Sequence, residues 1–321
     1  MSFFAILLAL VLEQARPLAT DNPIHRMVQA WTGWVARTLD AGVQHLAWVA
    51  WGTATLAPAA LALVVHALAD WGLGWVVAVL WNVALLYVTL GFRQFSHHFT
   101  EIRDALDEGN EQRARELLAD WQQVRVGDIP RSELLRHVIE YSVVAAHRHV
   151  FGVFFWYAVL SVVGLGPVGA VVYRLAEYVQ RHWAREQSAD GGVSPMLAEV
   201  ARRAWTALDW LPSRATALAF AIVGSFEDAM DGWRNHAQKF PQDNDGVILA
   251  ATAGAINVRL GGAGLHTSAA DDEHATSLSG ASTPGEPAQI GHLASVVGLV
   301  WRSVIMWLVL VALLTMAKLM G

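Results

Sequence analysis

One segment of the sequence combines glycines and an arginine in an order that could hold an anion. It runs from Ala253 to Gly262 and reads Ala-Gly-Ala-Ile-Asn-Val-Arg-Leu-Gly-Gly. Glycines that follow an arginine can present consecutive backbone N–H groups to an anion, and Arg259 can add a bidentate contact to a phosphate. A simple turn at Gly261 and Gly262 explains the same residues, so both interpretations stay open.

Other residue types limit the chemistry of the chain. It has no cysteine, which excludes disulfides, iron–sulfur clusters and zinc–thiolate sites. Its only lysines are Lys239 and Lys318, so a Walker A lysine is absent and a bound nucleotide phosphate must be held by arginine, metal or backbone. Acids in the polar parts could hold magnesium through one or two carboxylates, and solvation explains them equally well. The 13 histidines lack the spacing of a His-Glu-x-x-His metal site.

The elements that must position these residues are predicted to be membrane helices. Hydrophobic residue types make up 55% of the 321 residues and charged types only 16%, whereas soluble domains average about 25% charged residues. The formal net charge of −6 argues against a nucleic-acid partner. We therefore expect an all-α, polytopic integral membrane protein whose partner is the lipid bilayer.

The apolar runs predict where the chain crosses the bilayer. Residues 46–92 contain two uncharged runs and are expected to form a transmembrane hairpin, and residues 293–317 a C-terminal transmembrane helix. The apolar run 3–12 is too short to cross and predicts a short or tilted helix. Arginines follow the hairpin, whereas its link, residues 66–70, has none. The positive-inside rule therefore places that link outside and the arginine-rich segment in the cytoplasm.

Three further segments complete the expected organisation. Residues 93–150 alternate apolar and charged positions and predict a polar helical insertion. Residues 151–173 are apolar but interrupted between Gly164 and Pro167, which predicts a broken, re-entrant membrane segment. Broken segments of this kind also line the substrate sites of transporters, so a transporter is a further and weaker functional hypothesis. Residues 174–293 are predicted to be polar or amphipathic, with a flexible loop at 267–287.

A series of short motifs in this order resembles the CobD/CbiB family of cobalamin biosynthesis. Phe155-Trp156, Gly166 to Ala170 and Tyr173-Arg174 resemble the family's Phe-Trp, Gly-Gly-x-x-Gly-Ala and Tyr-Arg motifs. The segment Leu211-Pro212-Ser213-Arg214 is similar to its Ile-Pro-Ala-Arg motif. Asn244, Gly246 and the run from Ala253 to Gly262 resemble its Ser-Pro-Asn-Ala-Gly and Val-Arg-Leu-Gly-Gly region. The resemblance spans most of the chain.

The resemblance implies a bacterial inner-membrane enzyme of the adenosylcobinamide-phosphate synthase type. Such an enzyme joins aminopropanol or its phosphate to a propionate of a corrinoid substrate, in an amide ligation that depends on ATP and Mg. Carried over position by position, it implies catalytic carboxylates at Glu140, Glu177 and Asp209. It also implies substrate or phosphate contacts from Arg174, Arg214, Asn244, Gly246, Arg259, Gly261 and Gly262. It assigns no metal ligand, and a homo-oligomer is compatible with it.

Several acids of the family pattern are replaced in this chain. Val144, Ala145 and Arg148 occupy the positions of a Glu-Asn-x-x-Asp motif, and Trp205 and Thr206 lie near the position of an Asp-Asp pair. Because phosphoryl chemistry usually relies on metal held by carboxylates, these losses weaken the catalytic interpretation. The related AmpE proteins share the scaffold and are linked to β-lactamase regulation. A non-enzymatic, AmpE-like membrane regulator or sensor is therefore the alternative.

Overall fold

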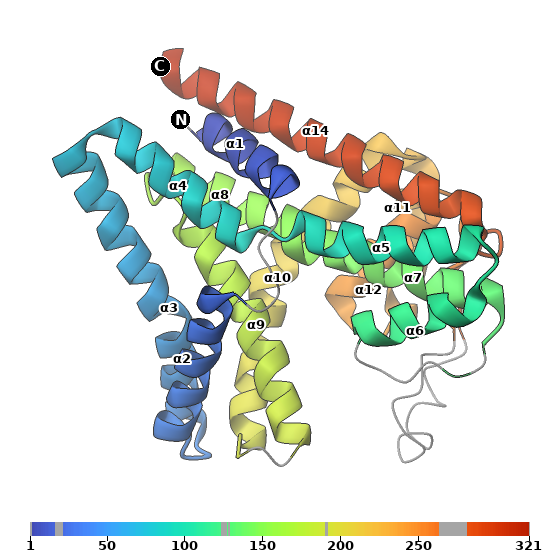
Figure 1. The fold of residues 1–321 in the computed structure, drawn as a ribbon, viewed down its shortest axis with the longest axis horizontal. Coiled ribbons are helices and arrows are strands. Elements are labelled where there is room, and N and C mark those ends of the chain that lie inside the picture. Colours follow the sequence, from blue (N-terminus) through green and yellow to red (C-terminus); the bar gives the residue numbers. More distant parts are fainter. Residues whose placement is uncertain are drawn as a thin grey trace. The chain divides into compact units, whose positions relative to one another are not determined.

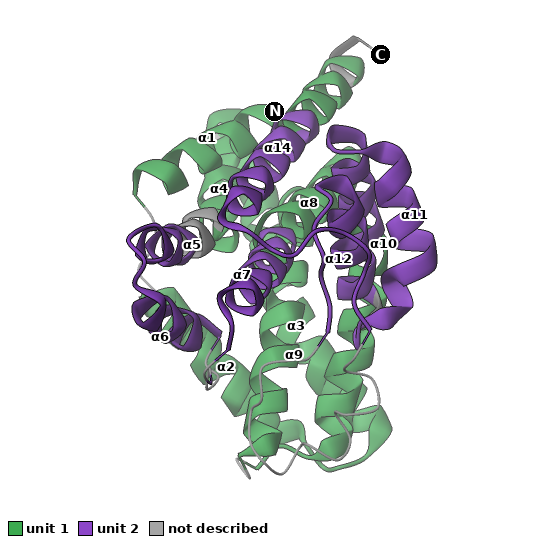
Figure 2. Ribbon diagram, turned by 90° about the vertical axis from the view of Figure 1, so that its right-hand side faces the viewer, with its two compact units in different colours: residues 1–91, 148–212, 308–321 green, residues 92–147, 213–307 purple. Residues whose placement is uncertain are grey.

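A computed structural model describes residues 2–16, 22–122, 127, 129–189, 192–262 and 281–320. Within these residues every regular element is a helix, and only two isolated β-bridges occur (Figure 1). The predicted all-α class is confirmed. The chain forms two compact units (Figure 2). Unit 1 comprises Met1–Gly91, Arg148–Pro212 and Leu308–Gly321, and unit 2 comprises Phe92–His147 and Ser213–Trp307.

Unit 1 is built from the N-terminal helices and the middle of the chain. Helix α1 packs against α4 and α8, while α3 packs against α2, α4 and α9. The unit also contains the first part of α10 and the last part of α14. Its elements are α1 (Ser2–Ala15), α2 (Pro23–Leu39), α3 (Gln44–Leu68), the π-helical turn η1 (Ala69–Leu73), α4 (Trp75–Thr89), α8 (Gly152–Val162), α9 (Val168–Ser188), α10 (Pro195–Val223) and α14 (Ile290–Met320).

A local capping signal fixes the start of α2, and a long-range contact holds its end. The side chain of Asn22 caps its first turn by accepting a hydrogen bond from the His25 backbone N–H, and Pro23 begins the helix. At the other end the carboxylate of Asp40 accepts hydrogen bonds from the backbone N–H and the hydroxyl of Ser194, at 2.7 and 2.6 Å. The Ser194 hydroxyl in turn accepts from the backbone N–H of Leu197 in the first turn of α10. Asp40 therefore links the end of α2 to the start of α10.

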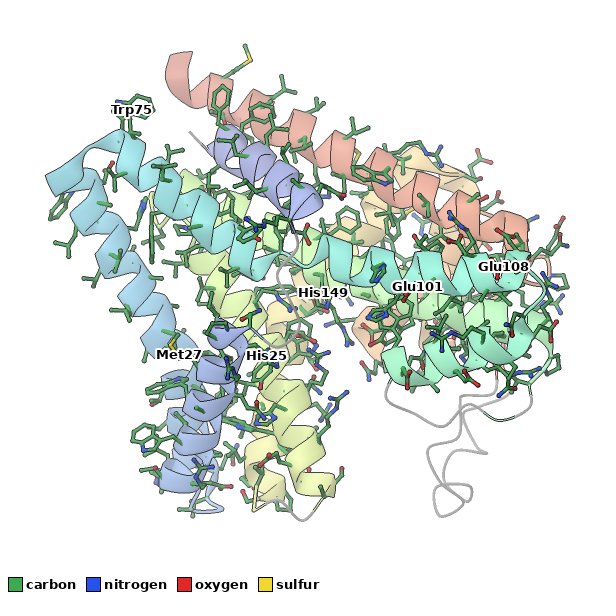
Figure 3. All side chains as sticks on the ribbon, viewed as in Figure 1. His25, Met27, Trp75, Glu101, Glu108 and His149 are labelled. Carbon is green, nitrogen blue, oxygen red and sulfur yellow. The ribbon has the colours of Figure 1, made fainter. Side chains whose placement is uncertain are left out.

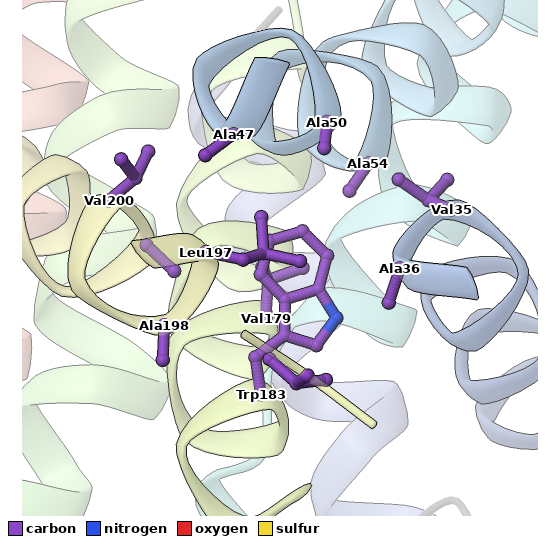
Figure 4. Close-up of a cluster of buried hydrophobic side chains, with 12 residues drawn as sticks. Val35, Ala36, Ala47, Ala50, Ala54, Val179, Trp183, Leu197, Ala198 and Val200 are labelled. Atoms are coloured by element: carbon purple, nitrogen blue, oxygen red, sulfur yellow. The ribbon is translucent and has the colours of Figure 1, made fainter. Parts of the chain in front are cut away.

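The core of unit 1 pairs small residues on α3 with one large aromatic side chain on α9 (Figure 4). Ala47, Ala50 and Ala54 are spaced by three and four residues, so they share one face of α3. Trp183 is fully buried in the same cluster. The small side chains leave room for this indole, whose burial removes a large apolar surface from water or lipid headgroups.

Helices α8 and α9 are separated at the position where the sequence predicts a break. Helix α8 ends at Val162 and α9 begins at Val168, and between them Gly164 and Gly166 have φ of +80° and +54°. These angles strongly favour glycine. The two helices then approach closely, because a Cβ at Gly169 would lie 2.3 Å from the carbonyl oxygen of Trp156. Whether this segment re-enters the bilayer remains a prediction.

Unit 2 contains the polar helices and the segment that carries the glycine-arginine run. Helices α5, α6 and α7 pack on one another, and α12 packs against α7, α11 and η3. The π-helical turn η2 (His147–Phe151) follows α7 without interruption. The elements are α5 (Phe92–Asp107), α6 (Glu111–Gln122), α7 (Arg131–Ala146), α11 (Phe226–His236), the 3₁₀ turn η3 (Ala237–Lys239) and α12 (Asp243–Ala255), together with the last part of α10 and the first part of α14.

Glycines allow α11 and α12 to lie in near contact. A Cβ at Gly254 would lie 2.1 Å from the carbonyl oxygen of Asp228, and one at Gly232 would lie 2.4 Å from that of Ala250. Side chains larger than hydrogen at these two positions would force the helices apart. The glycines of this region therefore serve helix packing as well as the turn that follows α12.

Part of the expected flexible loop 267–287 is held in place. Its residues 267–280 lie outside the described residues, but the described end pairs with the glycine-arginine run. Val258 forms a β-bridge with Glu286 and Gly261 forms one with Ser282. Thr283 is buried between them, with 3% of its surface exposed. The end of the loop is thus ordered by backbone pairing, a long-range contact that its composition does not predict.

Within the described residues, three helical stretches are long and apolar enough to cross a membrane: Gln44–Gly72, Arg131–Val162 and Ile290–Ala317. The first and third correspond to expected membrane segments. The second joins the end of the expected polar insertion to the start of the expected broken segment, since α7, η2 and α8 run on as one helix. The second run of the expected hairpin forms the shorter apolar helix Trp75–Thr89.

The outer surfaces of these helices suit lipid. Leu61, Leu80 and Leu313 are each at least 60% exposed, and Trp71 is 88% exposed. Large apolar patches on a protein in water are rare and costly, whereas the hydrocarbon of a bilayer solvates them. The length, composition and exposed faces of the helices therefore agree on a membrane protein.

Candidate functional site

In unit 2 an arginine on α7 is held between two carboxylates on the same helix. Arg136 donates to Glu133 at 2.7 and 2.9 Å and to Glu140 at 2.9 and 3.1 Å. The spacing of three and four residues places all three side chains on one helix face. Only 5% of the Arg136 side chain is exposed, and the His137 ring lies 3.5 Å from the Glu140 carboxylate. A buried guanidinium requires such partners, so Glu140 is first of all its counter-ion.

The same carboxylate holds the predicted anion-binding turn. The backbone N–H of Gly261 donates to Oε1 of Glu140 at 2.7 Å. Gly261 and Gly262 have φ of +82° and +109°, so the turn depends on glycine at both positions. At least one N–H of the predicted anion nest is therefore used by a carboxylate of the chain itself, and Arg136 neutralises the charge of that carboxylate.

The segment around this turn is fixed by backbone hydrogen bonds. The Arg259 N–H donates to the Glu286 carbonyl at 2.7 Å, and Leu260 and Thr283 exchange hydrogen bonds at 2.8 and 2.9 Å. The Arg259 side chain is exposed. In the described part of the chain its guanidinium forms no ion pair or hydrogen bond. The fold thus immobilises the backbone of Arg259 and leaves its charged group facing solvent, where it can contact a dissolved anion.

Two other predicted residues of unit 2 contact each other. Arg214 on α10 donates to the amide oxygen of Asn244 at 3.2 Å, and Asn244 is buried near the start of α12. Gly246 follows on the same helix, and a Cβ there would lie 2.4 Å from the carbonyl oxygen of Ala237. Gly246 is therefore explained by packing against η3. Arg214 and Asn244 form a polar contact between two helices.

In unit 1 the predicted catalytic residue Glu177 is buried among basic side chains. Arg174 donates to its carboxylate at 3.1 Å and Arg181 at 3.4 Å, and Glu177 is 1% exposed. Burial by itself would raise the pKa of Glu177, but the charges of Arg181, Arg174, His149 and Arg148 together lower it to about 2. The carboxylate is therefore ionised at neutral pH and too weak a base to remove a proton. Its role in this structure is that of a counter-ion.

Asp209, the third predicted carboxylate, is tied to α9. The Tyr173 hydroxyl donates to Oδ1 of Asp209 at 2.8 Å, and both residues are fully buried. A buried phenol beside a carboxylate keeps its proton, because a second negative charge there would be desolvated and repelled. The phenol therefore stays neutral and acts as a donor. A Cβ at Gly152 would lie 2.1 Å from the Tyr173 hydroxyl, so α8 closes over this pair.

A small pocket in unit 2 adds acids that the sequence did not single out. Its volume is about 120 Å³, and Asp228, Asp231, His236 and Asn257 are among the residues that line it. The aspartates are three residues apart on α11, so they share one helix face. Asn257, with φ of +51°, lies in the part of the glycine-arginine run that follows α12. The i, i+3 spacing of two aspartates was the available signal for this pocket.

The structure thus groups the predicted residues by unit. Unit 2 contains Glu140 with Gly261, Arg214 with Asn244, and also Gly246, Arg259 and Gly262. Unit 1 contains Arg174 with Glu177, and Asp209.

The sequence did not assign a role to several residues that contact or surround the predicted carboxylates. They are Arg136, His137, Arg148, His149, Tyr173 and Arg181. Of these, His149 is labelled in Figure 3. Spacings of three or four residues from an acid could have found Arg136, His137 and Arg181.

Among the described residues, a pair of carboxylates in unit 2 has the chemistry of a magnesium donor set. Within the described residues, no group of three or more His, Asp or Glu side chains could hold a metal ion by itself. Magnesium, however, usually keeps several waters and needs only one or two carboxylates together with substrate phosphates. Asp228 and Asp231 on the wall of the small pocket meet that lower requirement.

Fold and surface define the class of the protein as an all-helical membrane protein with buried arginine–carboxylate clusters. The sequence model of the family described as "CobD/Cbib protein" matches residues 3–300. The chain therefore belongs to the CobD/CbiB family of cobalamin biosynthesis proteins. This confirms the family suggested by the sequence motifs.

Individual relatives agree with this assignment. The chain is 33% identical over 207 residues to the cobalamin biosynthesis protein CobD of Chromobacterium violaceum, an alignment that covers 63% of each chain. It is 28% identical over 243 residues to CobD of Stutzerimonas stutzeri, covering 74% of this chain and 72% of that one. For CobD of Leptospira interrogans the identity is 25% over 209 residues and 61% of each chain. No solved structure matches the chain. These relatives lend no support to the AmpE-like alternative.

Proposed function

We propose that the chain is the membrane synthase that joins aminopropanol or its phosphate to a propionate of a corrinoid. The reaction forms an amide at the expense of ATP, with magnesium as the metal. Membership of the CobD/CbiB family over residues 3–300 supports this proposal. So does the exposed Arg259 side chain on a rigid turn, which is the observation that carries it.

In this proposal, the surroundings of each predicted residue determine its role in the reaction. Arg259 is free to contact a phosphate in solution, and its guanidinium can do so with two hydrogen bonds. Glu140 holds the turn and Arg136 balances its charge, so Glu140 positions Arg259 and does not act on substrate itself. When bound, magnesium would neutralise phosphate charge, and Asp228 and Asp231 are the residues that would hold it.

The remaining predicted carboxylates have a different role in this proposal. Glu177 and Asp209 each accept hydrogen bonds from buried donors in unit 1, and neither lines a described pocket. We assign them to positioning Arg174 and Tyr173 within unit 1. The proposal also places the protein in the bacterial inner membrane with the lipid bilayer as its partner, and it allows a homo-oligomer.

Complementation of a bacterial corrinoid auxotroph that lacks the authentic synthase tests the proposal. The wild-type chain should restore growth, and Arg259→Ala should abolish it while leaving the melting temperature unchanged, because the side chain is exposed. Arg113→Ala is the matched control, since Arg113 is an exposed arginine of the same unit that pairs with Glu116. Absence of growth with the folded wild-type chain in the membrane would contradict the proposal.

A further inference from the structure

Unit 1 contains a half-open cavity that the proposed synthase chemistry does not use. Its volume is about 400 Å³, and it lies between α1, η1, α4, α8, the end of α14 and the loop that separates α8 from α9. Pockets of 300–1,000 Å³ hold small organic molecules. The residues with polar side-chain groups on its wall include His66, Asp70, Asn82, Tyr157, Ser161 and Thr315. The cavity is therefore large enough for a ligand and has a polar side that can orient it.

Two polar atoms on this wall lack hydrogen-bond partners among the described residues. The side-chain oxygen of Asn82 is one, although the amide nitrogen of the same residue donates to the Ala78 carbonyl at 2.8 Å. The hydroxyl oxygen of Ser161 is the other. Asn82 is 9% exposed, and buried polar atoms are normally paired. The unsatisfied oxygen atoms call for an occupant that donates hydrogen bonds.

The charged side chains of the cavity wall indicate the charge of the molecule that would bind there. Asp70, His66 and Tyr157 are the ionisable side chains among the described lining residues, and no lysine or arginine is among them. Asp70 lies close to the end of the apolar stretch Gln44–Gly72, and ionisable residues in such stretches commonly mark ligand or ion sites. A carboxylate with nearby acceptors and no lysine or arginine favours a cation.

The broken helix shapes one side of the cavity. Gly164 and Gly166 line it, and a Cβ at Gly166 would lie 2.9 Å from Nε2 of His66. Breaks of this kind within a membrane bring polar backbone only against protein or a wet cavity. Trp75, at the start of α4 in Figure 3, also lines the cavity, together with aliphatic side chains such as Val79 and Leu314. These walls suit an apolar body.

We propose that this cavity binds a small organic cation, an ammonium group carried on an apolar body. The ammonium donates to Asp70, to the Asn82 side-chain oxygen and to the Ser161 hydroxyl, while the apolar body lies against Val79, Leu314 and the aromatic face of Trp75. A short amino alcohol of the kind used in the proposed ligation would leave the apolar part of the cavity unfilled. The site is therefore separate from the proposed synthase activity.

Calorimetric titration of the full-length protein in lipid nanodiscs tests the proposal with three probes of similar shape. These are 2-phenylethylammonium, the neutral 2-phenylethanol and the anion phenylacetate. The cation should bind saturably with one site per chain, the alcohol at least tenfold more weakly, and the anion without a measurable signal. Equal partitioning of all three probes, or no saturable binding of the cation to folded protein, would overturn the proposal.

Two variants and a matched control localise the binding. Asp70→Asn should remove the preference for the cation over the alcohol, and Ser161→Ala should weaken cation binding severalfold. Ser303→Ala is the control because its hydroxyl is also buried without a partner among the described residues but does not line the cavity. It should leave the affinity unchanged. If Ser161→Ala and Asp70→Asn both bind the cation as the wild type does, the proposed site is wrong.

Discussion

The backbone N–H of Gly261 donates a 2.7 Å hydrogen bond to the carboxylate of Glu140, which lies 121 residues earlier in the chain. This contact ties the glycine-arginine turn to α7 and gives the turn a fixed anion from within the protein. Because Arg136 balances the same carboxylate, the backbone that carries Arg259 is held by one charge network. Glu140 therefore contributes to the stability of unit 2 and also holds the turn that carries Arg259 in the proposed function.

Replacing Glu140 should destabilise unit 2 strongly. Glu140→Ala leaves Arg136 buried with a single carboxylate and removes the acceptor of the Gly261 N–H, a loss of about 3 kcal/mol in the free energy of unfolding. Glu133→Ala should cost about 1 kcal/mol or less, since the Glu133 side chain is 43% exposed. Denaturant titration of the detergent-solubilised protein measures both. Equal effects of the two variants would refute the assignment of Glu140 as the central counter-ion.

The ion pairs of Glu177 predict a loss of stability in acid. Its pKa is lowered in the folded protein, from 4.5 to about 2. A lowered folded-state pKa means that the stabilising contribution is present in full above the unfolded pKa and is lost as the pH falls through the folded pKa. The window therefore lies between pH 4.5 and about 2. The shift corresponds to a stabilisation of about 3 kcal/mol at neutral pH.

Melting temperatures measured across this pH window check the prediction. Glu177→Gln should be less stable than wild type at neutral pH and should lose part of the acid dependence. Glu199→Gln is the matched control, because Glu199 pairs with Arg202 and Arg203 three and four residues away but keeps 33% of its side chain exposed, so that solvent screens the pair. It should behave like wild type. An identical acid profile for wild type and Glu177→Gln would show that another group controls the transition.

Removal of the Tyr173 hydroxyl should destabilise the protein, because this hydroxyl donates to the buried carboxylate of Asp209. Tyr173→Phe deletes a donor to a buried carboxylate and should cost about 2 kcal/mol in the free energy of unfolding. Asp209→Asn, introduced together with Tyr173→Phe, removes the buried charge and should restore part of the loss. A double-mutant cycle on the purified protein measures this coupling energy. Additive effects would mean that the two side chains do not depend on each other.

The close contact of α11 and α12 predicts that Gly254 cannot be enlarged. Gly254→Ala places a Cβ 2.1 Å from a backbone oxygen, so the helices must separate, at a cost of about 1–3 kcal/mol. Gly298→Ala on α14 is the control, since a Cβ there meets no atom within 4 Å. Alanine at that position should be neutral or slightly stabilising, because it favours the helix. Thermal unfolding of both variants compares them. A neutral Gly254→Ala would mean that α11 and α12 are not in this contact.

The sequence alone determined the properties that depend on neighbouring residues. Uncharged runs of sufficient length predict Gln44–Gly72 and Ile290–Ala317 as candidate spans, because the transfer of side chains to lipid is a sum over a short stretch. The break near Gly164 is equally local, since glycine and proline restrict the backbone where they stand. The family motifs also lie in short stretches, and the family match over residues 3–300 confirmed the family that they indicate.

Only the tertiary structure decided which side chains meet. Glu140 is paired with Gly261, Tyr173 with Asp209, and Asp40 with Ser194, each from a distant part of the chain. The cavity with Asn82 and Ser161 likewise requires α4 and α8 to converge. Helical periodicity reveals partners three and four residues away and carries no information on packing between helices. Burial then sets the chemistry, because a carboxylate that looks catalytic in the sequence becomes a counter-ion once arginines surround it.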